Sequence, residues 1–263
     1  MYYIKHNTLM EEIYNIIAED FSKTRCYTWK CLKIFGKKII KDDDIQNKTL
    51  IDIGCGNGRN LDYIVLENII KKNNIYSIDG CQKFVKMVKD KGYNCNECLI
   101  QEMKNIDNNT YDYLICIAVI HHLRTDEERF NAIVDCWNLV KKGGKAMFTT
   151  WAFEQNYIYK DKDKEIVINT KRPKKLELGD NIVVWKGNRV LEKDRVLEKD
   201  KMLEKDKVFE NDNKKYNNIV NRYYYIFNEE TWKKLWKSFE LLFPEVNIEI
   251  IYEEQNWITY VSS

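Results

Sequence analysis

The chain lacks an excess of either charge. It carries 43 basic and 41 acidic residues, a formal net charge of +2. This balance excludes a polycation that coats nucleic acid, so we expect no DNA partner and any RNA contact only through local patches. No run of about 18 apolar residues is present for a membrane span, and residues 1–15 lack the apolar centre of a signal peptide. We therefore expect no membrane association and a cytoplasmic protein, with the nucleus as a second compartment.

The chain also lacks a complete metal-binding pattern. Its eight cysteines are scattered, which in a reducing compartment is typical of free thiols. Cys95 and Cys98 form half of a zinc pattern that has no second half in range. Two adjacent histidines, His121 and His122, lack the helical spacing or third clustered ligand of a zinc site. We predict no metal.

A glycine loop follows the first buried strand pattern. The apolar run over residues 50–53 is interrupted by Asp52 and turns into Gly54-Cys55-Gly56-Asn57-Gly58. Glycine permits positive φ and close backbone approach to a ligand, and the helix expected over 59–68 would point its N-terminal amides there. Leu61 stands where a dinucleotide fingerprint has its third glycine, which disfavours a pyrophosphate. The loop predicts a cradle for a smaller nucleoside.

A second acid follows the second predicted strand. Asp79, with Gly80 after it, ends the apolar run over 75–78, where a ribose-binding carboxylate lies in a βαβ unit. Asp52 and Asp79 together favour a hydroxylated, cationic ligand. S-adenosylmethionine, with ribose hydroxyls, an ammonium and a sulfonium, meets that description. The alternative is a glycine turn in an ordinary α/β protein.

Helical and strand patterns alternate along the chain. We predict helices over 8–21, 82–91, 126–140 and 228–243, and strands over 75–78, 93–98, 113–117 and 145–150. The segment Lys142-Gly143-Gly144 is expected to end the third helix. Residues 246–252 and 257–261 are expected to form an edge hairpin. This order predicts an α/β fold, a parallel sheet with its ligand at the carboxyl ends of the strands.

Residues 156–221 differ in character from the rest. Four hexads begin at Val190, Val196, Met202 and Val208, and a six-residue period rotates the apolar pair by about 240° per repeat on a helix. No single helical face can stay buried, so we predict disorder, with a solvated, fraying helix as the alternative. The basic run over 171–175, with Arg172, is a candidate RNA contact. We divide the chain into a core (1–155), this insertion (156–221) and a segment completing the core (222–263).

The glycine loop resembles motif I of the S-adenosylmethionine-dependent methyltransferases. Further segments resemble one family among them, the eukaryotic tRNA wobble-uridine carboxymethyl methyltransferases, which comprise the free-standing yeast-type enzyme and the methyltransferase domain of the AlkB-type tRNA hydroxylase. The matching segments are Tyr14 to Ala18, Phe21 to Arg25, Ile117 to Leu123 with Glu128 and Arg129, Trp151 to Gln155, Arg222 to Tyr224 with Phe227, and Asn256-Trp257.

The resemblance implies a seven-stranded Rossmann-like fold, to which the hexad segment of this chain adds a low-complexity insertion. It implies methyl esterification of the carboxymethyl group of 5-carboxymethyluridine at the wobble position, with S-adenosyl-L-methionine as cofactor. The implied partners are the tRNA anticodon loop and a small zinc-binding activator protein that covers a sheet edge. The residues expected to contact cofactor are Tyr14, Asp52, Gly54, Cys55, Gly56, Gly58, Asp79, Gly80, Gln101 and Ala118.

The substrate side follows from the same resemblance. Arg25 and Arg222 are expected to grip the carboxylate, and His121 and His122 to position uracil or carboxylate. The further residues expected to bind substrate are Trp151, Tyr223 and Arg172.

The sequence departs from the family at three places, and two other functions stay open. Lys30 replaces a proline and Tyr225 a histidine, and no acid follows the third strand for the adenine amino group, where Gln101 or Glu102 substitutes. One alternative is methylation of a small-molecule acid. The other is a catalytically silent RNA-binding scaffold.

Overall fold

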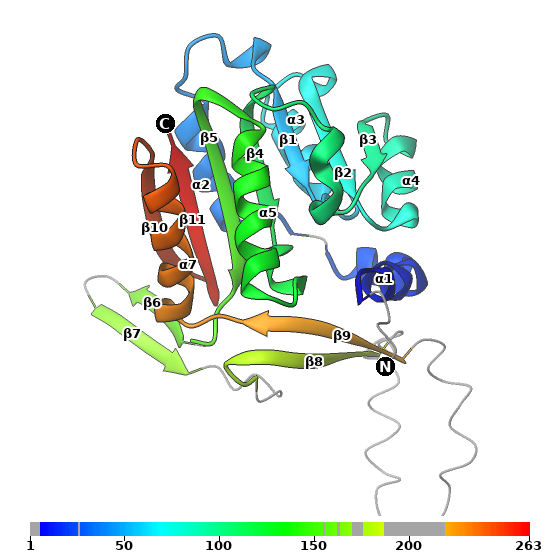
Figure 1. The fold of residues 1–263 in the computed structure, drawn as a ribbon, viewed down its shortest axis with the longest axis vertical. Coiled ribbons are helices and arrows are strands. Elements are labelled where there is room, and N and C mark those ends of the chain that lie inside the picture. Colours follow the sequence, from blue (N-terminus) through cyan, green and yellow to red (C-terminus); the bar gives the residue numbers. More distant parts are fainter. Residues whose placement is uncertain (1–5, 26, 155, 162–163, 170–175, 187–218) are drawn as a thin grey trace, which may run out of the picture.

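The fold is built on a seven-stranded sheet (Figure 1). The computed structural model describes residues 6–25, 27–154, 156–161, 164–169, 176–186 and 219–263. The strands, in sheet order, are β10 (Asn247–Glu253), β11 (Asn256–Ser262), β5 (Val140–Trp151), β4 (Tyr111–Ile117), β1 (Leu50–Ile53), β2 (Ile75–Asp79) and β3 (Asn94–Glu97). β1 to β5 are mutually parallel and β11 is antiparallel to β5 and β10. The predicted parallel sheet with its edge hairpin is confirmed.

Helices cover both faces of this sheet. The described helices are α1 (His6–Lys23), α2 (Lys30–Ile39), α3 (Arg59–Leu66), α4 (Gln82–Asp90), α5 (Asp126–Asn138) and α7 (Glu229–Leu242), with short 3-10 turns η1 (Ile45–Asn47), η2 (Lys72–Asn74), η3 (Ile100–Asn105) and η4 (Ile120–His122). α5 and α7 pack on one face through Ile133, Trp232 and Trp236. α2 to α4 pack on the other through residues such as Phe35 and Leu61. Burial on both faces explains why the central strands are almost wholly apolar.

The glycines after α5 do not end it, contrary to the sequence prediction. The helix stops at Asn138, and β5 already begins at Val140. Gly143 and Gly144 lie inside β5, where the pairing with β4 shifts register. A Cβ at Gly144 would lie 2.5 Å from a Val140 methyl and 2.7 Å from the Asp112 carbonyl oxygen. The two glycines therefore permit an irregularity in the strand.

Two antiparallel strand pairs lie where the sequence analysis expected disorder. β6 (Asn156–Asp161) pairs with β7 (Lys164–Asn169), and β8 (Gly179–Lys186) pairs with β9 (Ile219–Ile226). The β8–β9 ribbon crosses beside α1 at the carboxyl end of the parallel sheet (Figure 1). The four hexads lie outside the described residues. β9 crosses the predicted boundary between the insertion and the C-terminal segment, so the strand spans both.

A capping box fixes the start of α5, just after η4. The Thr125 hydroxyl accepts the Glu128 amide at 3.0 Å, while the Glu128 carboxylate accepts the Thr125 and Arg124 amides. These bonds satisfy amides that the first helical turn leaves unpaired. η4 carries the histidine pair, so this cap stabilises the segment that positions it.

We predict that Thr125→Ala lowers the free energy of unfolding by about 1 kcal/mol, because the Glu128 amide loses its acceptor. Urea unfolding followed by circular dichroism measures the change. Thr125→Ser keeps the hydroxyl and should remain close to wild type. Equal loss of stability in both variants would contradict the role of the hydroxyl.

Candidate active site

The glycine loop forms one wall of a cavity at the carboxyl end of the sheet. Gly54, Gly56 and Gly58 all have positive φ, of 70°, 55° and 75°. A Cβ at Gly54 would lie 2.4 Å from a Val119 methyl, so only glycine fits there. A Cβ at Gly56 would meet no atom within 4 Å. The loop thus packs tightly beneath Gly54 and presents bare backbone to the cavity at Gly56.

The cavity measures about 1240 Å³ with the open solvent at its mouth included. Its lining includes most of the predicted cofactor residues, namely Tyr14, Gly54, Cys55, Gly56, Asp79, Gly80, Gln101 and Ala118, together with Arg25 and His122. One open cavity thus brings together most of the predicted cofactor residues, an arginine and a histidine.

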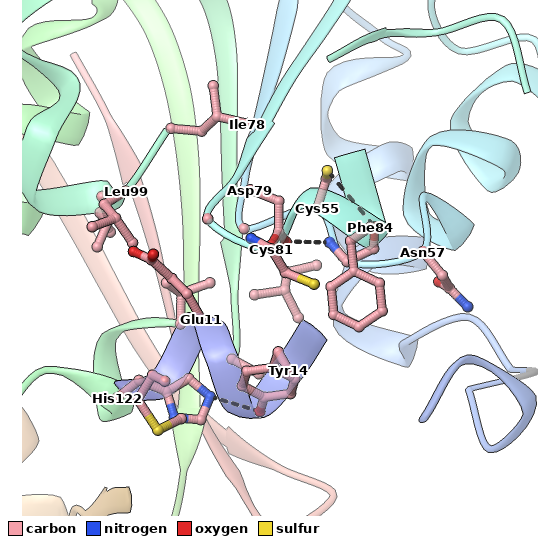
Figure 2. Close-up of a pocket in the computed structure, with 18 of the residues that line it drawn as sticks. Glu11, Tyr14, Cys55, Asn57, Ile78, Asp79, Cys81, Phe84, Leu99 and His122 are labelled. Atoms are coloured by element: carbon pink, nitrogen blue, oxygen red, sulfur yellow. Dashed lines mark hydrogen bonds between the residues drawn. The ribbon is translucent and has the colours of Figure 1, made fainter. Parts of the chain in front are cut away.

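Asp79 and Glu11 form an acidic end of this cavity. Asp79 accepts the Gly56 and Cys81 amides, each at 2.8 Å, which fixes its carboxylate against the glycine loop. Burial raises the pKa of Asp79 to about 6, although these two bonds oppose the shift. Glu11 of α1 points toward Leu99 (Figure 2), and one of its oxygens is buried without a partner among the described residues. Burial and then nearby acids raise the pKa of Glu11.

Asp52 and Gly58 lie away from the cavity lining. The Asp52 side chain is fully buried, and neither carboxylate oxygen has a hydrogen-bond partner among the described residues. Burial, followed by Asp79, raises the pKa of Asp52 well above its ordinary value. Gly58 is the N-cap of α3 and packs against Val88 of α4. The second acid on the cavity wall is thus Glu11, which the sequence analysis missed.

A chain of hydrogen bonds links the cavity to β9. The Nδ1 of His122 lies 3.0 Å from the carbonyl oxygen of Tyr223, so Nδ1 carries the proton and donates it. The other ring nitrogen, Nε2, therefore accepts from the Tyr14 hydroxyl at 3.1 Å (Figure 2). The Tyr14 oxygen lies 3.3 Å from the Tyr224 hydroxyl, which accepts from Arg222 Nη1 at 2.6 Å. The tautomer of His122 is thus assigned from its partners.

Both histidines are neutral. Burial first, and Arg222 nearby, lower the pKa of His122 to about 4, against the opposing Tyr223 bond. Burial, then His122 and Arg222, lower the pKa of His121 well below its ordinary value. His121 Nδ1 accepts the Trp151 amide at 3.3 Å, so its side chain faces β5. His121 supports the cavity from behind, and His122 faces it.

Arg222 and Arg25 place two positive charges beside His122 and Tyr224. Among the described residues, no acidic side chain forms an ion pair with either arginine. Arg222 is 3% exposed, and its Nε has no hydrogen-bond partner among the described residues. Its guanidinium lies 5.1 Å from the Trp185 ring and 5.2 Å from that of Tyr224. Arg25 lines the cavity with its guanidinium 4.4 Å from the Phe21 ring. Burial first, and Arg222 further, lower the pKa of Arg25.

The other described residues that were predicted to bind substrate lie behind the cavity lining. Trp151 stacks on Tyr224 at 4.4 Å and is absent from the cavity lining. Tyr223 is buried, and its hydroxyl donates to Asp180 at 2.5 Å. Arg222, like His121, also lies behind the lining. Arg172 lies outside the described residues.

Arg124 and Phe84 are further cavity residues that the sequence analysis did not single out. Arg124 lines the cavity, with its guanidinium 4.3 Å from the Tyr223 ring. Phe84 of α4 faces the cavity beside Tyr14 (Figure 2). Phe84 belongs to a helical apolar pattern, which gives no sign that it contacts a ligand. Arg124 directly follows the histidine segment, and this neighbourhood was the one signal in the sequence for its place at the cavity.

The comparisons with known proteins agree with the fold. Residues 51–148 match the methyltransferase domain family model. A tRNA (carboxymethyluridine(34)-5-O)-methyltransferase of Schizosaccharomyces pombe is 32% identical over 154 residues, 57% of this chain and 60% of that protein. The mouse protein of the same name, ALKBH8, is 31% identical over 56% of this chain and 20% of its own length. The chain thus spans less than two thirds of the length of these relatives. The similarity to tRNA carboxymethyluridine methyltransferases that the sequence motifs indicated is confirmed.

Solved structures show the same architecture. An S-adenosylmethionine-dependent methyltransferase of Clostridium acetobutylicum has a TM-score of 0.56, with 13% identity, 95% of this chain covered and 98% of that chain. Synechocystis magnesium protoporphyrin IX methyltransferase with bound SAH has a TM-score of 0.55, with 12% identity and coverage of 98% and 99%. The fold is that of S-adenosylmethionine-dependent methyltransferases. None of the described helices is long and apolar enough to cross a membrane.

We predict that His122 titrates near pH 4, because its buried ring is held neutral between Tyr14 and Tyr223. Two-dimensional NMR of ring-labelled histidine should show the Nδ1-protonated tautomer from pH 8 down to about pH 5. Tyr14→Phe provides the comparison, since it removes the donor to Nε2. A midpoint near 6.5 in wild type would contradict the assigned geometry.

Proposed function

We propose that this chain is an S-adenosylmethionine-dependent methyltransferase that esterifies the 5-carboxymethyl group of a wobble uridine in tRNA. The observation that carries the proposal is a pair of arginines without a described acid to neutralise them, Arg25 on the cavity wall and Arg222 buried behind the lining. A buried cation without a counter-ion is costly. An anionic substrate supplies the missing charge, and the named relatives act on a carboxymethyluridine.

The residues at the acidic end fit the cofactor. Gly56 presents backbone to open space, so a ligand can lie directly against the loop. Asp79 faces the cavity as the acid expected to bind ribose hydroxyls. Glu11 adds a partner-free buried oxygen, which a cationic amine would satisfy. Gln101 and Leu99 line the part of the cavity where an adenine ring is expected.

The reaction needs no general base in this chain. S-adenosylmethionine, when bound, supplies an electrophilic methyl group. A carboxylic acid with an ordinary pKa near 4 is already an anion at neutral pH and can attack without losing a proton. His122 is neutral, and its Nε2 lone pair is already bonded to Tyr14. The side chains thus act by orienting the carboxylate.

Orientation alone can account for much of the rate. Holding two reacting groups in line contributes about 7–11 kcal/mol to lowering a barrier. Arg25 on the cavity wall and Arg222 behind Tyr224 provide planar guanidinium groups, which bind carboxylates through two parallel hydrogen bonds. The Tyr224 hydroxyl holds one Arg222 nitrogen in place, which fixes the direction of the remaining donors.

Two macromolecular partners belong to the proposal. The anticodon loop is single-stranded, so its wobble base can be turned into the cavity without breaking a duplex. Arg124 in the cavity lining and the basic run with Arg172 are candidate phosphate contacts. A small zinc-binding activator protein would cover an open strand edge, and β3 and β10 are the two edges of the main sheet.

The direct test is methyl transfer to tRNA. The protein, with and without a co-expressed activator, is incubated with S-adenosylmethionine and tRNA that carries 5-carboxymethyluridine. We expect nucleoside mass spectrometry to show conversion to the methyl ester, with no conversion of tRNA that lacks the carboxymethyl group. Turnover of free carboxylic acids in place of tRNA would contradict the proposal and favour the small-molecule alternative.

We predict that Arg25→Lys lowers kcat about 100-fold, because lysine keeps the charge but loses the planar fork that aligns the carboxylate. Arg222→Lys should behave likewise. Calorimetry should show unchanged cofactor affinity in both, since neither contacts Asp79 or the glycine loop. Arg124→Lys is the matched control and should raise the KM for tRNA more than it lowers kcat. Equal loss of cofactor binding in the Arg25 and Arg222 variants would refute the carboxylate role.

A further inference from the structure

Two thiols meet behind the glycine loop. Cys55 of the loop and Cys95 of β3 lie 40 positions apart in sequence, and their Sγ atoms are 3.7 Å apart. Both side chains are buried, at 4% and 1% exposure. Cys55 forms part of the cavity wall (Figure 2), and Cys95 lies directly behind it. The pair is therefore reached from solvent through the cavity.

The backbone around Cys55 has little freedom to move. The amides of Gly54 and Cys55 both donate to the Ile78 carbonyl oxygen, at 2.8 and 3.1 Å. The Gly56 amide is bound to Asp79, and Gly54 packs against Val119. The Cys55 side chain is thus fixed in its direction toward β3, which is an edge strand.

The two thiols differ in acidity. The contact with Cys55 lowers the pKa of Cys95, and a bond with Ser77 acts in the same direction, while burial opposes both. The same contact and burial raise the pKa of Cys55. Cys95 is therefore the more readily ionised sulfur and Cys55 lies beside it at 3.7 Å as the second thiol, which is the composition of a redox-active pair.

We propose that Cys55 and Cys95 are a modification site at which a hydroperoxide forms an intramolecular disulfide, and that this disulfide weakens cofactor binding in the adjoining cavity. The first half of the proposal stands on the thiol geometry alone. The second half rests on the proposed function, because it requires that S-adenosylmethionine binds in this cavity.

The chemistry balances with hydrogen peroxide as the oxidant. The Cys95 thiolate attacks one peroxide oxygen, the O–O bond breaks, and the departing hydroxide takes up the proton that Cys95 had released, giving water. Cys95 becomes a sulfenic acid. The Cys55 sulfur then attacks the Cys95 sulfur, and the sulfenic hydroxide leaves with the Cys55 proton as a second water. Two thiols are oxidised by two electrons and one peroxide is reduced.

Bond formation must displace the loop or the strand. A disulfide requires sulfurs about 2.0 Å apart, so the two Sγ atoms must approach by roughly 1.7 Å. Any shift of Cys55 pulls on Gly56, whose amide holds Asp79 in place. The disulfide is expected to disturb the contact between the glycine loop and Asp79.

Two other thiols provide contrast. Cys81 also lines the cavity, but its Sγ donates to the Asn15 side chain at 3.2 Å instead of meeting a thiol. Cys116 is fully buried in the sheet core and does not line the cavity. Cys81 shares access to the cavity but contacts an amide oxygen in place of a second thiol, so it is the matched control.

The test treats the reduced full chain with hydrogen peroxide and maps linked peptides by mass spectrometry. We expect a Cys55–Cys95 linkage that has lost two hydrogens and is reversed by dithiothreitol. Saturating S-adenosylhomocysteine should slow its formation, because the ligand fills the route to the thiols. The absence of this linkage, or its formation at the same rate with ligand bound, would overturn the proposal.

Calorimetry on the same samples tests the second half. The oxidised protein is expected to bind S-adenosylmethionine at least about tenfold more weakly than the reduced protein. Cys95→Ser and Cys95→Ala should each bind equally before and after peroxide, whereas Cys81→Ser should remain sensitive. Unchanged affinity in oxidised wild type refutes this half. Failure of the reduced protein to bind refutes the proposed function and leaves the disulfide mapping decisive for the first half.

Discussion

The hydrogen bonds of His122 join three segments that the sequence keeps far apart. Its Nδ1 donates to the carbonyl of Tyr223 in β9, and its Nε2 accepts from Tyr14 in α1. The first bond requires a proton on Nδ1 and the second forbids one on Nε2, so both persist only while the ring is neutral. Burial supplies that condition by lowering the pKa of His122. This ring thus ties α1 to β9 beside the cavity.

The cradle could be predicted because its signals are local. The strand before the loop is apolar, the glycines permit positive φ, and Asp79 ends the next strand, so each feature lies within a few residues of its cause. The position of Asp52 could not be predicted in the same way. Ile51 and Ile53 join the core on the α5 side, so alternation points Asp52 to the opposite face. Its burial there depends on how α3 and its neighbours pack, which no local pattern shows.

The β8–β9 ribbon shows a second feature that the sequence did not predict. β8 and β9 are separated by more than 30 residues, so neither strand is recognisable from a turn between them. The composition of the intervening hexads predicted disorder across the whole insertion, although β8 has an alternating buried and exposed pattern at Val183 and Val184. The resemblance to known enzymes marked Arg222 and Tyr223 without showing that a strand pair carries them. Helix α2 was missed, although its buried residues Cys31, Leu32, Phe35 and Ile39 have a helical spacing.

The proposed function has a consequence for the pH dependence of ligand binding. In that proposal Asp79 and Glu11 attract a cationic cofactor, and Arg25 on the cavity wall, with Arg222 behind it, attracts an anionic substrate. Arginine stays charged and His122 stays neutral across the physiological range. Asp79, with its pKa raised to about 6, binds a proton below that pH, and the pKa of Glu11 is raised in the same direction. The attraction for a cation therefore weakens as the pH falls. In the proposed function, the pH dependence of binding thus arises at the two acids that face the cofactor.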